Sequence, residues 1–108
     1  MEKIIIGSGV VSLWMRHARS LKDRRQVTQG LIQRLKNEGF SATEVDLGEN
    51  FKRAMIGFCF CSGESEVVTN HMERAKRIFV GDFEIVHAKT DFNELETGFE
   101  MPLIDPEV

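Results

Sequence analysis

Apolar side chains at alternate positions open the chain. Between residues 3 and 15, every odd position from Ile5 onwards is apolar or glycine, whereas the even positions include Ser8 and Ser12. A period of two is that of a β-strand whose alternate side chains face a core. The pattern therefore predicts a long strand with its odd positions buried.

The next segment has the period of a helix. Ser20 is a good N-cap, and Asp23, three positions later, can complete a capping box. The apolar residues that follow fall on one arc of a helical wheel: Leu21, Val27, Leu31, Ile32 and Leu35. Gly39 supplies a C-terminal stop. We expect a helix between Ser20 and Gly39.

Two strands are predicted after this helix. Residues 41–47 alternate between apolar and polar, and the segment from about 52 to 61 is apolar on both faces after Arg53. A strand that is apolar on both faces is typical of the centre of a sheet. Residues 62–65 then cap a second helix with its own apolar arc, closed at Gly81, and residues 83–90 form a fourth strand.

The predicted order is strand, helix, strand, strand, helix, strand. Its simplest arrangement is an α+β, ferredoxin-like βαββαβ two-layer sandwich, in which a four-stranded antiparallel sheet carries both helices on one face. The first and third strands are then central. We assign residues 1–92 to this domain and residues 93–108, which are acidic and contain both prolines, to an extended or mobile tail.

Length and charge limit the classes of function that the chain can have, but they do not identify one. A chain of 108 residues suits one domain and excludes most two-domain enzyme architectures. Residues 1–37 hold eight Lys and Arg against two acidic residues, a formal charge of +6, whereas the rest hold six against fifteen, a charge of −9. This asymmetry makes an anionic partner worth considering for the first part of the chain.

The location of the protein is inferred from the absence of membrane and disulfide signals. The opening apolar stretch is too short to span a bilayer, which needs about 20 apolar residues. Cys59 and Cys61 share a face of one strand without disulfide or metal-site spacing. We expect a cytoplasmic protein with no membrane partner, and we interpret the two cysteines as reduced packing residues.

A cluster of cations surrounds the start of the first helix. Its members are Arg16, Arg19, Lys22, Arg24 and Arg25. Cations oppose the dipole at a helix N-terminus, and a bound phosphate would reverse that cost, so the cluster indicates a site for phosphate or an RNA backbone. The alternative is a solvated loop whose cations pair with Asp23 and with the acidic part of the chain. Arg24 falls inside the apolar arc, where its charge needs a partner or an edge position.

The sheet offers a second possible contact with RNA. The segment from Gly57 to Phe60 resembles the end of the RNA-recognition motif signature, and Trp14 lies on the serine-containing side of the first strand. Phe58 and Phe60 either stack on bases or, as we favour, pack under the helices. Trp14 and Arg53 are our candidates for contacts on the sheet face. A second subunit could instead cover that face, and we expect a homodimer.

Nothing in the sequence forms a catalytic motif. His17, His71 and His87 are scattered, and His71 lies on the apolar arc of the second helix, where we expect a satisfied core histidine. Acyl phosphatases of this fold combine a phosphate-binding loop with an arginine and an asparagine. Arg16 or Arg19 with Asn50 or Asn70 are the candidates for such a pair, but the sequence alone does not place them together. We assign no catalytic residues, no cofactor and no metal site.

Several runs resemble one family of small bacterial proteins. They are SLKDRRQV at residues 20–27, LIQRLKN at 31–37, EVD at 44–46 and RAMIG at 53–57. Together they resemble the YlxP-like family, a domain of unknown function, over residues 7–91. The resemblance implies a ferredoxin-like fold and a gene setting among translation and ribosome-maturation factors. It implies a role at the small ribosomal subunit or its RNA, and no established enzymatic activity.

Together these features predict a cytoplasmic, RNA-binding protein associated with ribosomal RNA or the small ribosomal subunit. The alternative is a protein-interaction module, or a homodimeric scaffold, that does not bind RNA.

Overall fold

Six elements follow one another in the predicted order. A computed structural model of the chain describes residues 2–96. The elements are β1 (Lys3–Trp14), α1 (Leu21–Asn37), β2 (Ser41–Val45), β3 (Arg53–Ser62), α2 (Ser65–Ile78) and β4 (Glu84–Glu96). The strands form one antiparallel sheet in the order β2-β3-β1-β4, with β1 and β3 central. The predicted α+β, ferredoxin-like sandwich is confirmed.

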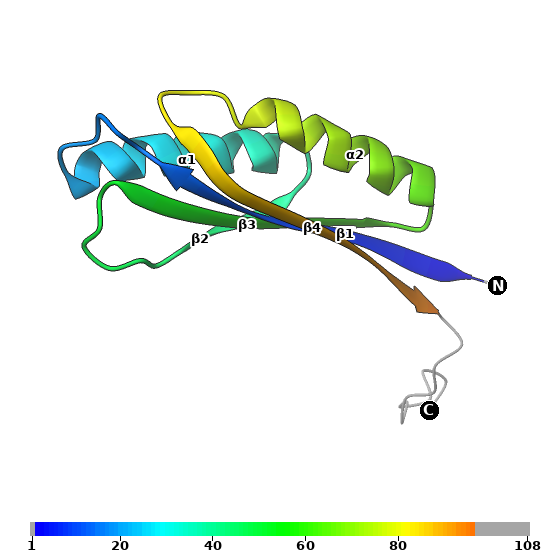
Figure 1. Cartoon of the computed structure of the whole chain (residues 1–108). Coiled ribbons are helices and arrows are strands. Elements are labelled where there is room, and N and C mark those ends of the chain that lie inside the picture. Colours follow the sequence, from blue (N-terminus) through cyan, green and yellow to red (C-terminus); the bar gives the residue numbers. More distant parts are fainter. Residues whose placement is uncertain (1, 97–108) are drawn as a thin grey trace, which may run out of the picture.

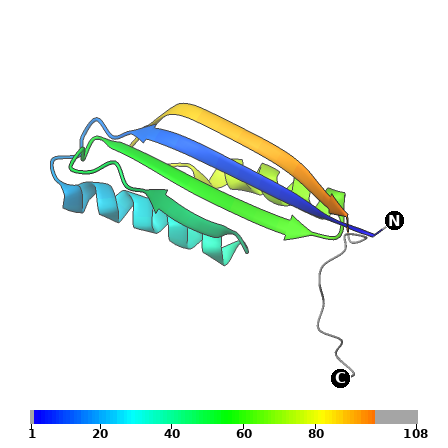
Figure 2. The same ribbon diagram turned by 90° about the horizontal axis from the view of Figure 1, so that it is seen from below.

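Both helices cover the same face of this sheet (Figure 1). No element of the described residues covers the opposite face, and Figure 2 views the molecule from that open side. Among residues 2–96, no helix combines the length and the apolar character that a membrane crossing requires.

The odd positions of β1 face the helices, as predicted. Ile5, Val11 and Leu13 are buried in the core. Gly7 and Gly9 share this face, and an ideal Cβ on either would lie within 3 Å of a neighbouring side chain. Glycine therefore lets the core side chains approach the β1 backbone directly.

The register of β3 resolves which of its two apolar faces lies in the core. Phe58 lies opposite Gly9 and is buried, with its ring centroid 5.5 Å from that of Phe40 in an edge-on contact. Phe60 is half-buried on the same side and stacks on His71 at 3.8 Å. The preferred core interpretation of both rings is confirmed, so neither is available to stack on a base.

Cys59 and Cys61 occupy the other side of β3. Both are free and exposed, because they point to the open face of the sheet. Our interpretation of these cysteines as packing residues is therefore wrong. The period of two did place them on one face, but apolar residues on both faces of the strand gave no sign of which face the helices cover.

The start of α1 is capped by its own side chains. Ser20 Oγ accepts a hydrogen bond from the Asp23 N–H at 3.1 Å, as a capping box requires. The Asp23 carboxylate accepts from the Arg19 N–H at 2.8 Å instead of from Ser20. At the other end, Glu38 is the C-cap and Gly39 follows with a φ of 91°. The predicted limits of this helix are confirmed.

β4 is longer than the sequence predicted. It runs to Glu96, which lies opposite Lys3, so the strand extends past its predicted end at residue 90 and past residue 92, the expected end of the domain. The remaining residues of the proposed tail, 97–108, lie outside the described residues. Every residue of β4 is exposed, because α1 and α2 approach β1, β2 and β3 but not β4.

One glycine of α1 has no packing role and offers a test of the helix. An ideal Cβ on Gly30 meets no atom within 4 Å. We expect Gly30→Ala to raise the free energy of unfolding by about 0.5–1 kcal/mol, since glycine costs a helix backbone entropy. Urea unfolding of the full chain measures this change, and a midpoint equal to or below that of the parent protein would contradict it.

Candidate nucleic-acid interface

The predicted basic cluster lies on the loop between β1 and α1 and on the first turns of that helix. Arg16, Arg19, Lys22 and Arg25 are exposed there, whereas Arg24 is not. Lys22 and Arg25 are three positions apart in α1, so they are neighbours on its surface.

Arg24 is a buried structural residue. It is only 5% exposed, and its Nη1 donates to the backbone oxygens of Gly48 at 3.2 Å and Asn50 at 2.7 Å. Its Nε lies 3.4 Å from Glu44 Oε1. The expectation that Arg24 needs a partner within the apolar arc is confirmed. Its proposed role as a phosphate ligand does not fit this environment, because its guanidinium is committed to the turn between β2 and β3.

Arg16 has an acidic partner from the last part of the chain. Its Nη2 lies 2.8 Å from Glu84 Oε1, and next to it His17 Nδ1 lies 3.0 Å from Asp82 Oδ1. All four side chains are more than half exposed, so each pair contributes little to stability. The pairing of loop cations with the acidic part of the chain therefore occurs, but only for part of the cluster.

Three cations of the cluster form no ion pair among the described residues. Within residues 2–96, the side chains of Arg19, Lys22 and Arg25 make no hydrogen bond and no ion pair. Because Ser20 and Asp23 already occupy amides at the start of α1, an anion here would meet the side chains rather than a free helix terminus.

The loop that presents these cations is held by a residue that the sequence analysis did not single out. Lys52 Nζ donates to the backbone oxygens of Arg16 at 2.6 Å and Ala18 at 3.3 Å. The N–H of Met15 also donates to the backbone oxygen of Lys52 at 2.7 Å. Sequence offers no signal for a side chain that bonds to backbone atoms 36 positions away.

Trp14 and Arg53, the two candidates for sheet-face contacts, lie opposite one another in the β1–β3 ladder on the open face. Trp14 is half-buried and Arg53 is exposed. Trp14 also lines a shallow hollow with Arg16, His17 and Asp82, among others. An aromatic ring and a cation thus border the loop that carries the basic cluster.

The family model described as "Protein of unknown function (DUF503)" matches residues 6–92. The chain belongs to the DUF503 family. The match includes the basic cluster, Trp14 and Arg53. No curated protein matches this DUF503 chain. Among solved structures, the de novo designed protein Foldit4 is similar with a TM-score of 0.41 and 10% identity, covering 89% of this chain and 99% of the designed one.

Residues 2–96 of this DUF503 protein contain no group of three His, Cys, Asp or Glu side chains placed to hold a metal ion. The exposed cationic side chains of Arg19, Lys22 and Arg25 are the feature that supports a function.

Proposed function

We propose that this protein binds the phosphate backbone of RNA through Arg19, Lys22 and Arg25. The observation that carries the proposal is their exposure without any acidic partner in residues 2–96, on a loop and helix start that Lys52 holds in place. Such cations neutralise phosphates and release the counterions condensed on them, and RNA is an abundant cellular polymer of phosphates.

Ribosomal RNA of the small subunit is the RNA that we propose as the partner. The support for this choice is the resemblance of residues 20–27 and of the runs that follow to YlxP-like proteins, whose gene setting is among translation and ribosome-maturation factors. Trp14 and Arg53 extend the proposed contact surface onto the open sheet face, where the ring could stack on an unpaired base.

Salt dependence of binding tests the proposal. We expect the full chain to bind small-subunit ribosomal RNA at low salt. A plot of log affinity against log salt should have a slope of about −2 to −3 for three phosphate contacts. The variant Arg19→Ala/Lys22→Ala/Arg25→Ala should bind about tenfold more weakly or worse, with a flatter slope. Arg24 is left intact in this variant, because its removal would disturb the fold.

A matched control removes the same types of charge elsewhere. Lys36, Arg74 and Arg77 are exposed residues of α1 and α2 outside the cluster. Their simultaneous replacement by alanine should change the affinity by less than the cluster variant does. The proposal is wrong if the parent chain does not bind RNA at low salt, or if the two triple variants lose affinity equally.

A further inference from the structure

Among residues 2–96, β4 is an edge strand that no other element covers on either face. It is thirteen residues long, its only neighbour in the sheet is β1, and neither helix approaches it. Four of its large apolar side chains are about half exposed: Ile85, Val86, Phe92 and Leu95. This strand therefore exposes both apolar side chains and one row of backbone hydrogen-bonding groups.

The other edge of the sheet is built differently. β2 is only five residues long, and α1 packs against it. A short, covered edge is a usual protection against pairing with another chain, whereas a long and partly apolar edge favours it. The only irregularity in β4 lies where its register against β1 shifts, between Ser12 and Leu13 of β1. Beyond this shift, residues 87–96 form a regular strand.

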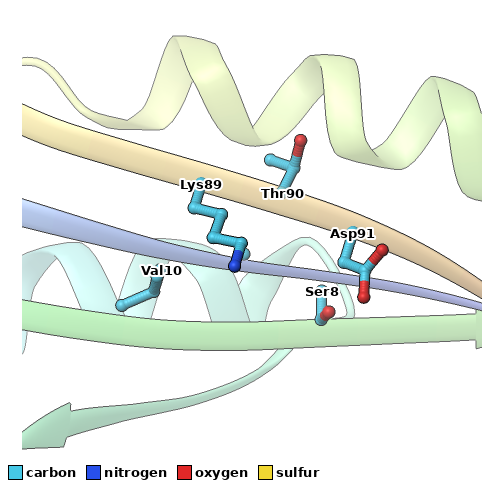
Figure 3. Close-up of a pocket in the computed structure, with 6 residues that line it drawn as sticks. Ser8, Val10, Lys89, Thr90 and Asp91 are labelled. Carbon is cyan, nitrogen blue, oxygen red and sulfur yellow. The ribbon is translucent and has the colours of Figure 1, made fainter.

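The charges at the middle of β4 are arranged symmetrically about one residue. Figure 3 shows Lys89 and Asp91 on the open-face side of the strand, beside Ser8 and Val10, with Thr90 on the opposite side. Lys89 makes no ion pair within residues 2–96, and Asp91 accepts hydrogen bonds only from its neighbours Phe92 and Asn93.

We propose that β4 pairs in antiparallel fashion with β4 of a second copy of this chain, with Thr90 on the two-fold axis. In that register Lys89 of one copy lies directly opposite Asp91 of the other, and the pair occurs twice. Opposite charges that face each other across an antiparallel ladder stabilise it. The occupant of the edge is thus identified by the chain's own charge pattern.

Neighbouring registers are disfavoured by the same charges. An axis through residue 89 places Lys89 opposite its own copy, and an axis through residue 91 does the same for Asp91. Like charges directly opposite each other are destabilising. An axis at residue 88 leaves Asp91 opposite Ile85, and an axis at residue 92 leaves it opposite Asn93. Only the register centred on Thr90 therefore joins the two opposite charges.

The helix side of the strand supports the same register. Ala88, Thr90 and Phe92 lie opposite Val11, Gly9 and Gly7 of β1, so they share that side. With Thr90 on the axis, Phe92 of each copy faces Ala88 of the other, and a large half-exposed ring meets a small side chain. The resulting dimer has one continuous eight-stranded sheet. It does not extend to a third copy, because the β4 edge of each copy is paired within the dimer.

This contact differs from the homodimer expected from the sequence, which covered the open face of the sheet. Pairing through the edge leaves that face and the basic cluster exposed, so it is independent of the proposed binding of RNA.

Charge exchange tests the edge contact in the full chain. We expect the parent protein to sediment as a dimer at micromolar concentrations. Lys89→Asp places two acidic residues opposite each other twice and should raise the dissociation constant about tenfold or more. The exchange Lys89→Asp/Asp91→Lys restores opposite charges across the axis and should bring the constant back to within about threefold of the parent value. Such a rescue would show that the single variant dissociates because of its charge, and not because it misfolds.

A disulfide across the axis tests the register itself. In a background with Cys59→Ser and Cys61→Ser, Thr90→Cys should form a covalent dimer on mild oxidation, because residue 90 faces its own copy. Phe92→Cys in the same background is the matched control on the same side of the strand. It faces residue 88 of the other copy and should not cross-link.

Two results would overturn the proposal. One is a monomer at every concentration up to high micromolar, which would leave the edge open to an extended peptide of another protein. The other is a dimer that Lys89→Asp leaves intact but that Met55→Glu, on the open face, dissociates.

Discussion

Arg24→Ala is expected to lower the free energy of unfolding by about 2–4 kcal/mol. Removal of one partner of a buried ion pair typically costs about 3–5 kcal/mol, and we reduce this value because the Glu44 side chain is 23% exposed. The variant also leaves the backbone oxygens of Gly48 and Asn50 without their donor. The substitution should therefore destabilise both the core and the turn between β2 and β3.

The next residue in α1 is the natural control. Arg25 has the same side chain but is exposed and without a partner within residues 2–96, so Arg25→Ala should change stability by less than about 0.5 kcal/mol. Urea unfolding of both variants measures the difference. Equal stability of the two variants would show that Arg24 does not hold the turn as its contacts indicate.

Gly9→Ala should destabilise the fold by about 1–3 kcal/mol through overcrowding of the core. An ideal Cβ at this position would lie 2.4 Å from Cζ of Phe58. The Phe58 ring cannot move aside freely, because it packs between Phe40 and Phe79 with centroid distances of 5.5 and 5.7 Å. The added methyl group must therefore push the strand or the ring out of place.

Thermal or urea unfolding checks this effect, and Gly57→Ala is the control in the neighbouring strand. An ideal Cβ on Gly57 points to the open face and meets its nearest atom only at 4.0 Å, so this change should have little effect. A double variant that combines Gly9→Ala with Phe58→Leu should lose less stability than the sum of the two single changes. Strict additivity would mean that the crowding is not between these two residues.

Periodicity predicted the elements that bury one face. β1 and both helices were identified because their apolar residues recur on a single side that meets the core. The same method predicted β4 only in part, over residues 83–90. Its later residues, from Asp91 to Glu96, are exposed on both faces and so have no apolar period, and the pairing with β1 that makes them a strand joins positions more than 80 residues apart.

In the candidate site, too, the sequence predicted properties that depend on neighbouring residues but not contacts between distant ones. The position of Arg24 in the apolar arc predicted that it needs a partner, but its partners come from the segment around Glu44 and Asn50, which only the fold brings near. The sequence left open whether Arg16 pairs with the acidic part of the chain, and in the structure Glu84 approaches it across 68 positions. Exposure of Lys22 could be expected from its place on the polar side of the helical wheel, whereas Arg19 precedes the helix and lies in the loop.

The order of strands has a consequence during translation. β1 is made before either of the strands that flank it in the sheet, since β3 begins at residue 53 and β4 at residue 84. While the ribosome is still synthesising residues 84–96, the nascent β1 has an unpaired edge twelve residues long that is rich in apolar side chains. Premature termination within that interval would release a chain with this edge uncovered. Completion of the last strand is therefore the step of synthesis that protects the first strand from aggregation.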